Sequence, residues 1–63
     1  MSHPHLHVRK ESKEAKYWLA PVRIARPGRF RAVELHEIER IIRNHHEFLL
    51  NAWREEQEKR ADR

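Results

Sequence analysis

The chain has 63 residues, of which 38% are charged and 38% hydrophobic, with one glycine, three prolines and no cysteine. A chain of this length forms one domain and buries only about 60% of its unfolded surface. We therefore exclude a multi-domain enzyme, a nucleotide-binding α/β fold, a disulfide and a cysteine-based zinc site. No apolar run approaches the roughly 20 residues of a membrane-spanning helix, and no signal-peptide core follows Met1, so we expect a cytoplasmic protein.

The net charge of +4 is concentrated in the first half of the chain. Residues 1–31 hold eight basic and two acidic residues, whereas residues 32–63 hold six basic and eight acidic ones. Segregated positive charge favours an anionic partner, such as a nucleic acid or an acidic protein. The alternative is an ordinary soluble surface with a basic bias.

The first half has the pattern of an antiparallel β-sheet. Residues 5–10 (HLHVRK) alternate polar and apolar side chains, as a half-buried strand does. A polar turn leads into a second strand at about 14–19. A third short strand follows at about 22–25, after Pro21, which cannot donate a ladder hydrogen bond. We expect two to three strands.

A four-residue turn over residues 11–14 sets the expected register of the first hairpin. It gathers the large apolar residues of both strands on one face, with Val8 opposite Tyr17. His7 and Trp18 then lie opposite each other on the other face, which is left cationic and aromatic.

The second half has the pattern of one long helix. Over about residues 32–60, apolar side chains recur at three- and four-residue steps, as in a helical stripe roughly 43 Å long. The alternative is a break at Asn44, which would cap a second helix with Glu47 three residues later. We favour the uninterrupted helix, with His45 lining the core and His46 facing solvent. The predicted fold is α+β, a short antiparallel sheet packed on one long C-terminal helix.

Three segments of the chain resemble a small bacterial family. They are residues 4–8 (PHLHV), residues 15–22 (AKYWLAPV) and the helical segment of residues 34–53, which ends in LLNAW. The family is the domain of unknown function numbered forty-one sixty, and the resemblance covers roughly residues 3–57. It implies a compact α+β domain, often encoded beside a second small protein in pairs that look like toxin–antitoxin modules.

The resemblance also implies a departure at the start of the chain. Members of the family usually carry an extra strand before the proline–histidine segment, whereas here Met1 stands only two residues ahead of His3. A sheet that is short of one strand exposes an edge, which is a template for pairing with another chain. We therefore expect association with a cognate partner protein or in a homo-oligomer. The helix residues expected at this interface are Phe48, Leu49 and Trp53.

The histidines of the first strand are the catalytic candidates. His5 and His7 occupy alternate positions, so a regular strand points both imidazoles to one side. Imidazole can act as acid or base near neutral pH, and the nearby Arg9 can stabilise a phosphorane-like charge. A metal-independent ribonuclease needs this set of groups. The alternative is a polar strand face without chemistry, which is the interpretation we favour for His3.

A second group of residues has the composition of a nucleic-acid-binding surface. Its cations would contact phosphates, and its indole would stack on an unpaired base. The alternative is that solvent or an acidic protein surrounds these charges. We expect neither metal nor cofactor, because Arg40 stands where a zinc-binding helix starting at His36 would need a second histidine. The expected nucleic-acid contacts are Lys10, Lys16, Trp18, Arg23, Arg26 and Arg29.

Two functional hypotheses follow from these patterns. In the first, the chain is the toxin-type component of a bacterial toxin–antitoxin-like module and acts on RNA through a basic His/Arg/Trp sheet face. In the second, it is a non-catalytic subunit that pairs with a cognate protein, or with itself, through its open sheet edge and helix. The first requires the imidazole, guanidinium and indole groups to gather on the side of the sheet that the helix leaves uncovered.

Overall fold

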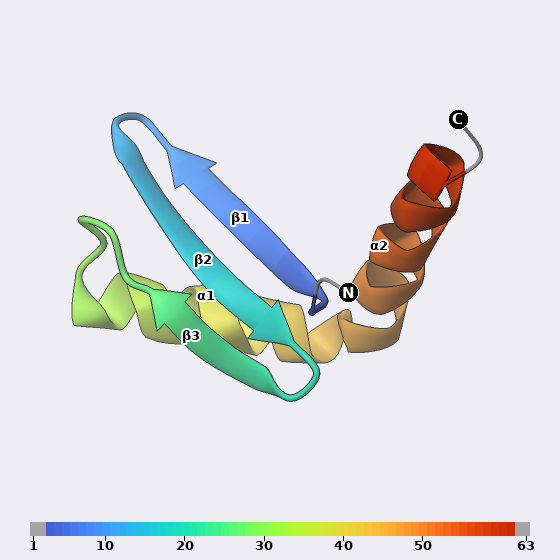
Figure 1. Ribbon diagram of the computed structural model, residues 1–63. Helices are drawn as coiled ribbons and strands as arrows, with labels where there is room; N and C mark the ends of the chain where they lie inside the picture. Colours follow the sequence, from blue (N-terminus) through green and yellow to red (C-terminus); the bar gives the residue numbers. More distant parts are fainter. Residues whose placement is uncertain (1–2, 62–63) are drawn as a thin grey trace.

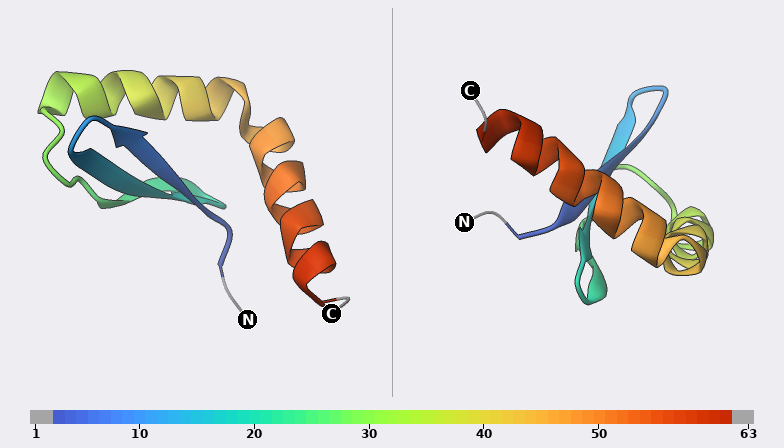
Figure 2. Two further views of the ribbon diagram at one scale, coloured as in Figure 1. Left: turned by 90° about the horizontal axis from the view of Figure 1, so that it is seen from above. Right: turned by 90° about the vertical axis from the view of Figure 1, so that its right-hand side faces the viewer.

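A computed structural model describes residues 3–61 of the chain. The three strands form one antiparallel sheet in the order β1-β2-β3, and two helices follow (Figure 1). Helix α1 lies across one face of the sheet (Figure 2). Helix α2 turns away from the direction of α1 and passes one end of the strands. The predicted α+β class is therefore confirmed. The elements are β1 (His5–Lys10), β2 (Lys13–Leu19), β3 (Val22–Arg26), α1 (Ala32–Asn44) and α2 (His46–Ala61).

The turn of the first hairpin has two residues and not four, so the predicted register is wrong. Val8 pairs with Ala15, where Tyr17 had been expected. In the turn, Glu11 has a φ of 56°, and two-residue hairpin turns use such left-handed conformations because they match the twist of the strands. The register moves by an even number of residues. Every side chain of the hairpin therefore keeps the face that the sequence predicted.

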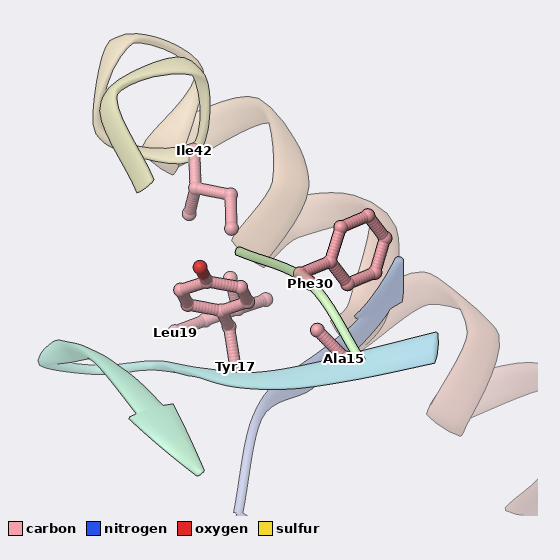
Figure 3. Packing of buried hydrophobic residues seen from close by; sticks show 5 residues of the cluster. All are labelled: Ala15, Tyr17, Leu19, Phe30 and Ile42. Carbon is pink, nitrogen blue, oxygen red and sulfur yellow. The ribbon is translucent and has the colours of Figure 1, made fainter. Parts of the chain in front are cut away.

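The hydrophobic core lies between α1 and the β2 face beneath it (Figure 3). Alternate residues of β2 point into it, and Tyr17 has no exposed surface. The hydroxyl of Tyr17 donates a hydrogen bond to the Leu35 carbonyl of α1 at 2.9 Å, so burial leaves this polar group satisfied. Burial also raises the pKa of Tyr17. The core residues are Ala15, Tyr17, Leu19, Phe30 and Ile42.

The second half forms two helices, which corrects the prediction of one long helix. Helix α1 ends at Asn44, one residue before the break at His45, so Asn44 does not cap the second helix either. The His45 N–H is shared between the carbonyls of Ile41 and Ile42, at 3.1 and 3.2 Å. The predicted placement of both histidines is wrong: His45 is exposed, whereas His46 is half-buried and its ring donates to the Leu19 carbonyl at the end of β2.

The break has a packing cause. A straight helix of about 43 Å would extend far beyond a seven-residue strand, which is about 23 Å long. By changing direction at the end of the sheet, α2 brings Leu49, Leu50 and Trp53 against the core cluster. Neither helix of residues 3–61 has the length and apolar character needed to cross a membrane.

Two contacts hold the loop between β3 and α1. Gly28 has a φ of 63°, and a Cβ added there would lie 2.1 Å from the backbone oxygen of Glu14. Glu34, in the first turn of α1, accepts a hydrogen bond from the Arg31 N–H at 2.8 Å. Its carboxylate also pairs with Lys13 Nζ at 3.2 Å, so the helix start is tied to β2.

Replacing the loop glycine tests the first contact. We expect Gly28→Ala to lower the free energy of unfolding by more than about 1 kcal/mol, because alanine disfavours the positive φ and its Cβ meets the β2 backbone. Urea unfolding followed by circular dichroism measures the change. Arg29→Ala, at the exposed next position, is the control. An unchanged midpoint for Gly28→Ala would contradict the close approach to Glu14.

The pH dependence of stability tests the second contact. The Arg31 N–H and the Lys13 ammonium lower the pKa of Glu34 in the folded chain. This stabilisation is therefore present above the unfolded pKa and is lost as the pH falls through the folded pKa. We expect Glu34→Gln to reduce stability at pH 7 and to weaken the loss of stability on acidification. Urea unfolding at pH 7 and pH 3 measures both effects. Glu37→Gln, in an exposed pair with Arg40, should reproduce neither.

Candidate nucleic-acid interface

The sheet face opposite α1 collects polar residues of all three strands, because the buried alternate residues of β2 point towards α1. The pairing of His5 with Trp18 and of His7 with Lys16 places the imidazole row of β1 beside the basic and aromatic residues of β2. The imidazole, guanidinium and indole groups thus share the face that α1 leaves uncovered. We call this surface the cationic face. Its residues are His5, His7, Arg9, Glu14, Lys16, Trp18, Arg23 and Arg26.

An irregularity in β3 brings Arg26 to this face. Tyr17 pairs with Ile24, but the preceding residue, Lys16, pairs with Arg26 and not with Ala25. A bulge of one extra residue reverses the alternation of the strand beyond it. Arg26 therefore lies beside Lys16, although regular alternation would turn it towards α1.

The two imidazoles of β1 lie close together, and each uses its Nδ1 atom for a polar contact. The ring centroids of His5 and His7 are 5.3 Å apart and their planes are nearly perpendicular. The Nδ1 of His5 is 2.9 Å from the His3 carbonyl, which can only accept, so this nitrogen carries the proton. The Nδ1 of His7 is 3.4 Å from a carboxylate oxygen of Glu14. Within residues 3–61, the structure gives neither Nε2 atom a hydrogen-bond partner.

Glu14 also contacts the guanidinium of Arg9, at 3.5 Å, but the Arg9 side chain is 75% exposed. Such an exposed ion pair contributes little to stability, so Arg9 can leave Glu14 for another anion. Sequence reasoning missed Glu14, because a four-residue turn would have included it. The two-residue turn places it opposite Arg9, and a carboxylate facing a guanidinium across a hairpin is the signal that could have found it.

Trp18 is at the centre of a small aromatic group. Lys16 Nζ lies over its indole, 4.6 Å from the ring centroid, and the rings of His3 and His5 approach at 6.0 and 6.3 Å. The His5 ring is also 6.2 Å from that of Trp53 in α2. Trp53 therefore packs against the start of β1, because the bend between the helices carries it there. Its role at an interface with another chain stays a prediction.

Two shallow hollows flank this group. One, of about 370 Å³, lies beside Trp18 at the cis Ala20–Pro21 turn and is lined on its far side by Arg23. The other, of about 270 Å³, is lined by His7, Lys16 and Arg26 together with the carboxylate of Glu14. The first hollow, which Trp18 and Arg23 line, is therefore the better place for an anionic ligand. Residues 3–61 contain no group of three or more His, Cys, Asp or Glu side chains arranged to hold a metal.

The structure separates some predicted site residues from the cationic face. Lys10 points to the helix side by the alternation of β1, and its charge helps to lower the pKa of Glu34. Arg29 lies exposed in the loop before α1. Of the predicted interface residues other than Trp53, Phe48 is 73% exposed and Leu49 is half-buried.

The family model described as "Domain of unknown function (DUF4160)" matches residues 1–54. The match covers most of the chain, so the protein belongs to this family, and the resemblance seen in the sequence is confirmed. No curated protein and no solved structure matches the chain. The function must therefore be argued from the surface itself.

Proposed function

We propose that the chain binds single-stranded RNA through its cationic face, as the toxin-type component of a bacterial toxin–antitoxin-like pair. The observation that supports this most directly is the placement of Trp18 on the sheet face that α1 leaves uncovered, with Lys16 over its ring, His5 beside it on β1 and Arg23 beside it on β3. Single-strand-binding surfaces combine such aromatic platforms with basic grooves.

The geometry suits a nucleotide chain laid across the strands. Trp18 pairs with His5 of β1 and with Arg23 of β3, so an imidazole and a guanidinium flank the indole at about the 4.8 Å spacing of neighbouring strands. Arg9 lies four residues further along β1, where it can contact a phosphate further along the nucleotide chain. A base stacked on Trp18 would displace Lys16, whose ammonium would then contact a phosphate. The cation–π contact is thus exchanged for a stacking and an ionic contact.

The imidazole row supports RNA cleavage as part of this proposal. Nε2 of neutral His5 accepts the proton of a ribose 2′-hydroxyl, whose oxygen attacks the adjacent phosphorus. His7, protonated and contacting Glu14, donates a proton to the departing 5′-oxygen. Arg9 moves from Glu14 to the phosphorane-like transition state. The products are a 2′,3′-cyclic phosphate and a free 5′-hydroxyl.

The exposure of these groups favours a second candidate function. The side chain of His7 is 52% exposed and that of Arg9 is more exposed still, so solvent reaches the reacting groups and screens their charges. Efficient acid–base catalysis depends on groups held in a dry, fixed arrangement. In this candidate function the chain is a non-catalytic subunit that pairs with a cognate protein, or with itself, through its open sheet edge and helix.

RNA binding is tested by titrating a fluorescent single-stranded oligonucleotide at several salt concentrations. We expect the logarithm of the affinity to fall with the logarithm of salt concentration, with a slope of about −0.7 per phosphate contacted. Trp18→Ala should weaken binding by about fivefold or more, because a stacked base is lost. Arg54→Ala, on the exposed side of α2, is the control. An affinity indifferent to salt, or unaffected by Trp18→Ala, would refute the proposed interface.

Cleavage is tested with His5→Gln and His7→Gln separately, in the presence of a metal chelator. If the row is catalytic, each change should slow RNA cleavage by about 100-fold or more while RNA affinity changes little. His36→Gln, on the exposed side of α1, is the matched control. Cleavage and cellular toxicity that survive both strand changes would exclude the catalytic role. A wild-type chain that binds RNA without cleaving it would exclude the cleavage step and leave the RNA-binding proposal standing.

A further inference from the structure

An apolar groove runs between β1 and the two helices, on the side of the sheet opposite the cationic face. Leu6 and Val8 of β1 form one wall, and Ile41, Phe48 and Leu49 form the other. Its volume is about 290 Å³, and almost all of its lining is apolar. Phe48 and Ile41 are 73% and 52% exposed, which is unusual for large apolar side chains lying side by side in so polar a chain.

The β1 wall of this groove ends at an open strand edge. β1 is the first strand of the sheet and pairs only with β2 within residues 3–61. Its outward N–H and C=O groups therefore offer a ladder on which another strand can form hydrogen bonds. An added strand would lie about 4.8 Å from β1, with alternate side chains entering the groove.

We infer that the edge of β1 and this groove bind one extended segment of a partner protein in which large apolar residues alternate with acidic ones. The apolar residues fill the groove against Phe48 and Ile41. The residues between them point to the other side of the sheet, beside the row of His5, His7 and Arg9. Carboxylates complement that row, and cross-strand pairs of opposite charge stabilise a sheet.

A second copy of the chain does not meet these requirements. Pairing β1 with β1 of another copy would place two rows of histidine and arginine side by side on the same face. The other free edge, β3, carries Arg23 and Arg26 on that face. Like charges on adjacent strands are destabilising, and basic residues on edge strands discourage self-pairing. The inference deepens the second candidate function and does not depend on RNA binding.

The test uses a blocked peptide, EVEFEVEVE, titrated into the isotope-labelled full chain and followed by NMR, with KVKFKVKVK as the charge-reversed control. We expect the acidic peptide to shift the amide signals of residues 5–10 and to slow hydrogen exchange of β1. The lysine peptide should bind at least tenfold more weakly. Combining Phe48→Ala with Ile41→Ser should reduce affinity by about tenfold or more, because two exposed apolar side chains of the helix wall are removed.

Ile24→Ser is the matched control, because Ile24 is an apolar residue on the other edge strand and is 37% exposed. It should leave peptide affinity unchanged, and the spectrum of each variant reports whether it is folded. Failure of the acidic peptide to bind at millimolar concentration, or equal binding of the lysine peptide, would overturn the inference. A concentration-dependent dimer with β1 amides already protected in the free chain would identify a second copy as the occupant and also overturn it. Loss of RNA binding in the separate oligonucleotide titration would leave the peptide result standing.

Discussion

The burial of β2 beneath α1 is the constraint on which the surfaces of this domain depend. Tyr17 is enclosed at the centre of the core, and its hydroxyl is bonded to the backbone of α1. Because side chains alternate along a strand, enclosing Ala15, Tyr17 and Leu19 forces Lys16 and Trp18 to the opposite face. The exposure of the cationic face therefore follows from the packing of the core.

The alternation of side chains along the strands predicted which face of the sheet each residue occupies, but it did not predict the pairing register of the first hairpin. The faces follow from the two-residue period of the strands, which any even shift preserves. The register depends on turn length, and the two-residue turn requires a left-handed conformation at Glu11. Glutamate rarely adopts this conformation, so the residue type did not indicate it. For the same reason Glu14 was missed as a site residue. The sequence does not mark the bulge that brings Arg26 to the cationic face either, because neither Ala25 nor Arg26 is a glycine, the residue that often marks a bulge.

The helix break could not be derived from periodicity, because the apolar stripe continues through it. Tertiary packing ends α1, because the sheet beneath it ends there and the ring of His46 donates to the Leu19 carbonyl at the end of β2. No glycine or proline marks the place. The consequence for function is large, since the bend carries Trp53 to the start of β1 and leaves Phe48 exposed beside the open edge.

The two proposed surfaces share one strand, and this sharing has a mechanistic consequence. β1 contributes its His/Arg row to the cationic face and its free edge to the apolar groove. A partner segment paired along that edge would bring carboxylates beside Arg9, whose present contact with Glu14 is long and exposed. An anion in that place would compete with an RNA phosphate for the same guanidinium. Occupation of the groove would thus weaken RNA binding by electrostatics alone, without covering Trp18, as expected of a neutralising partner.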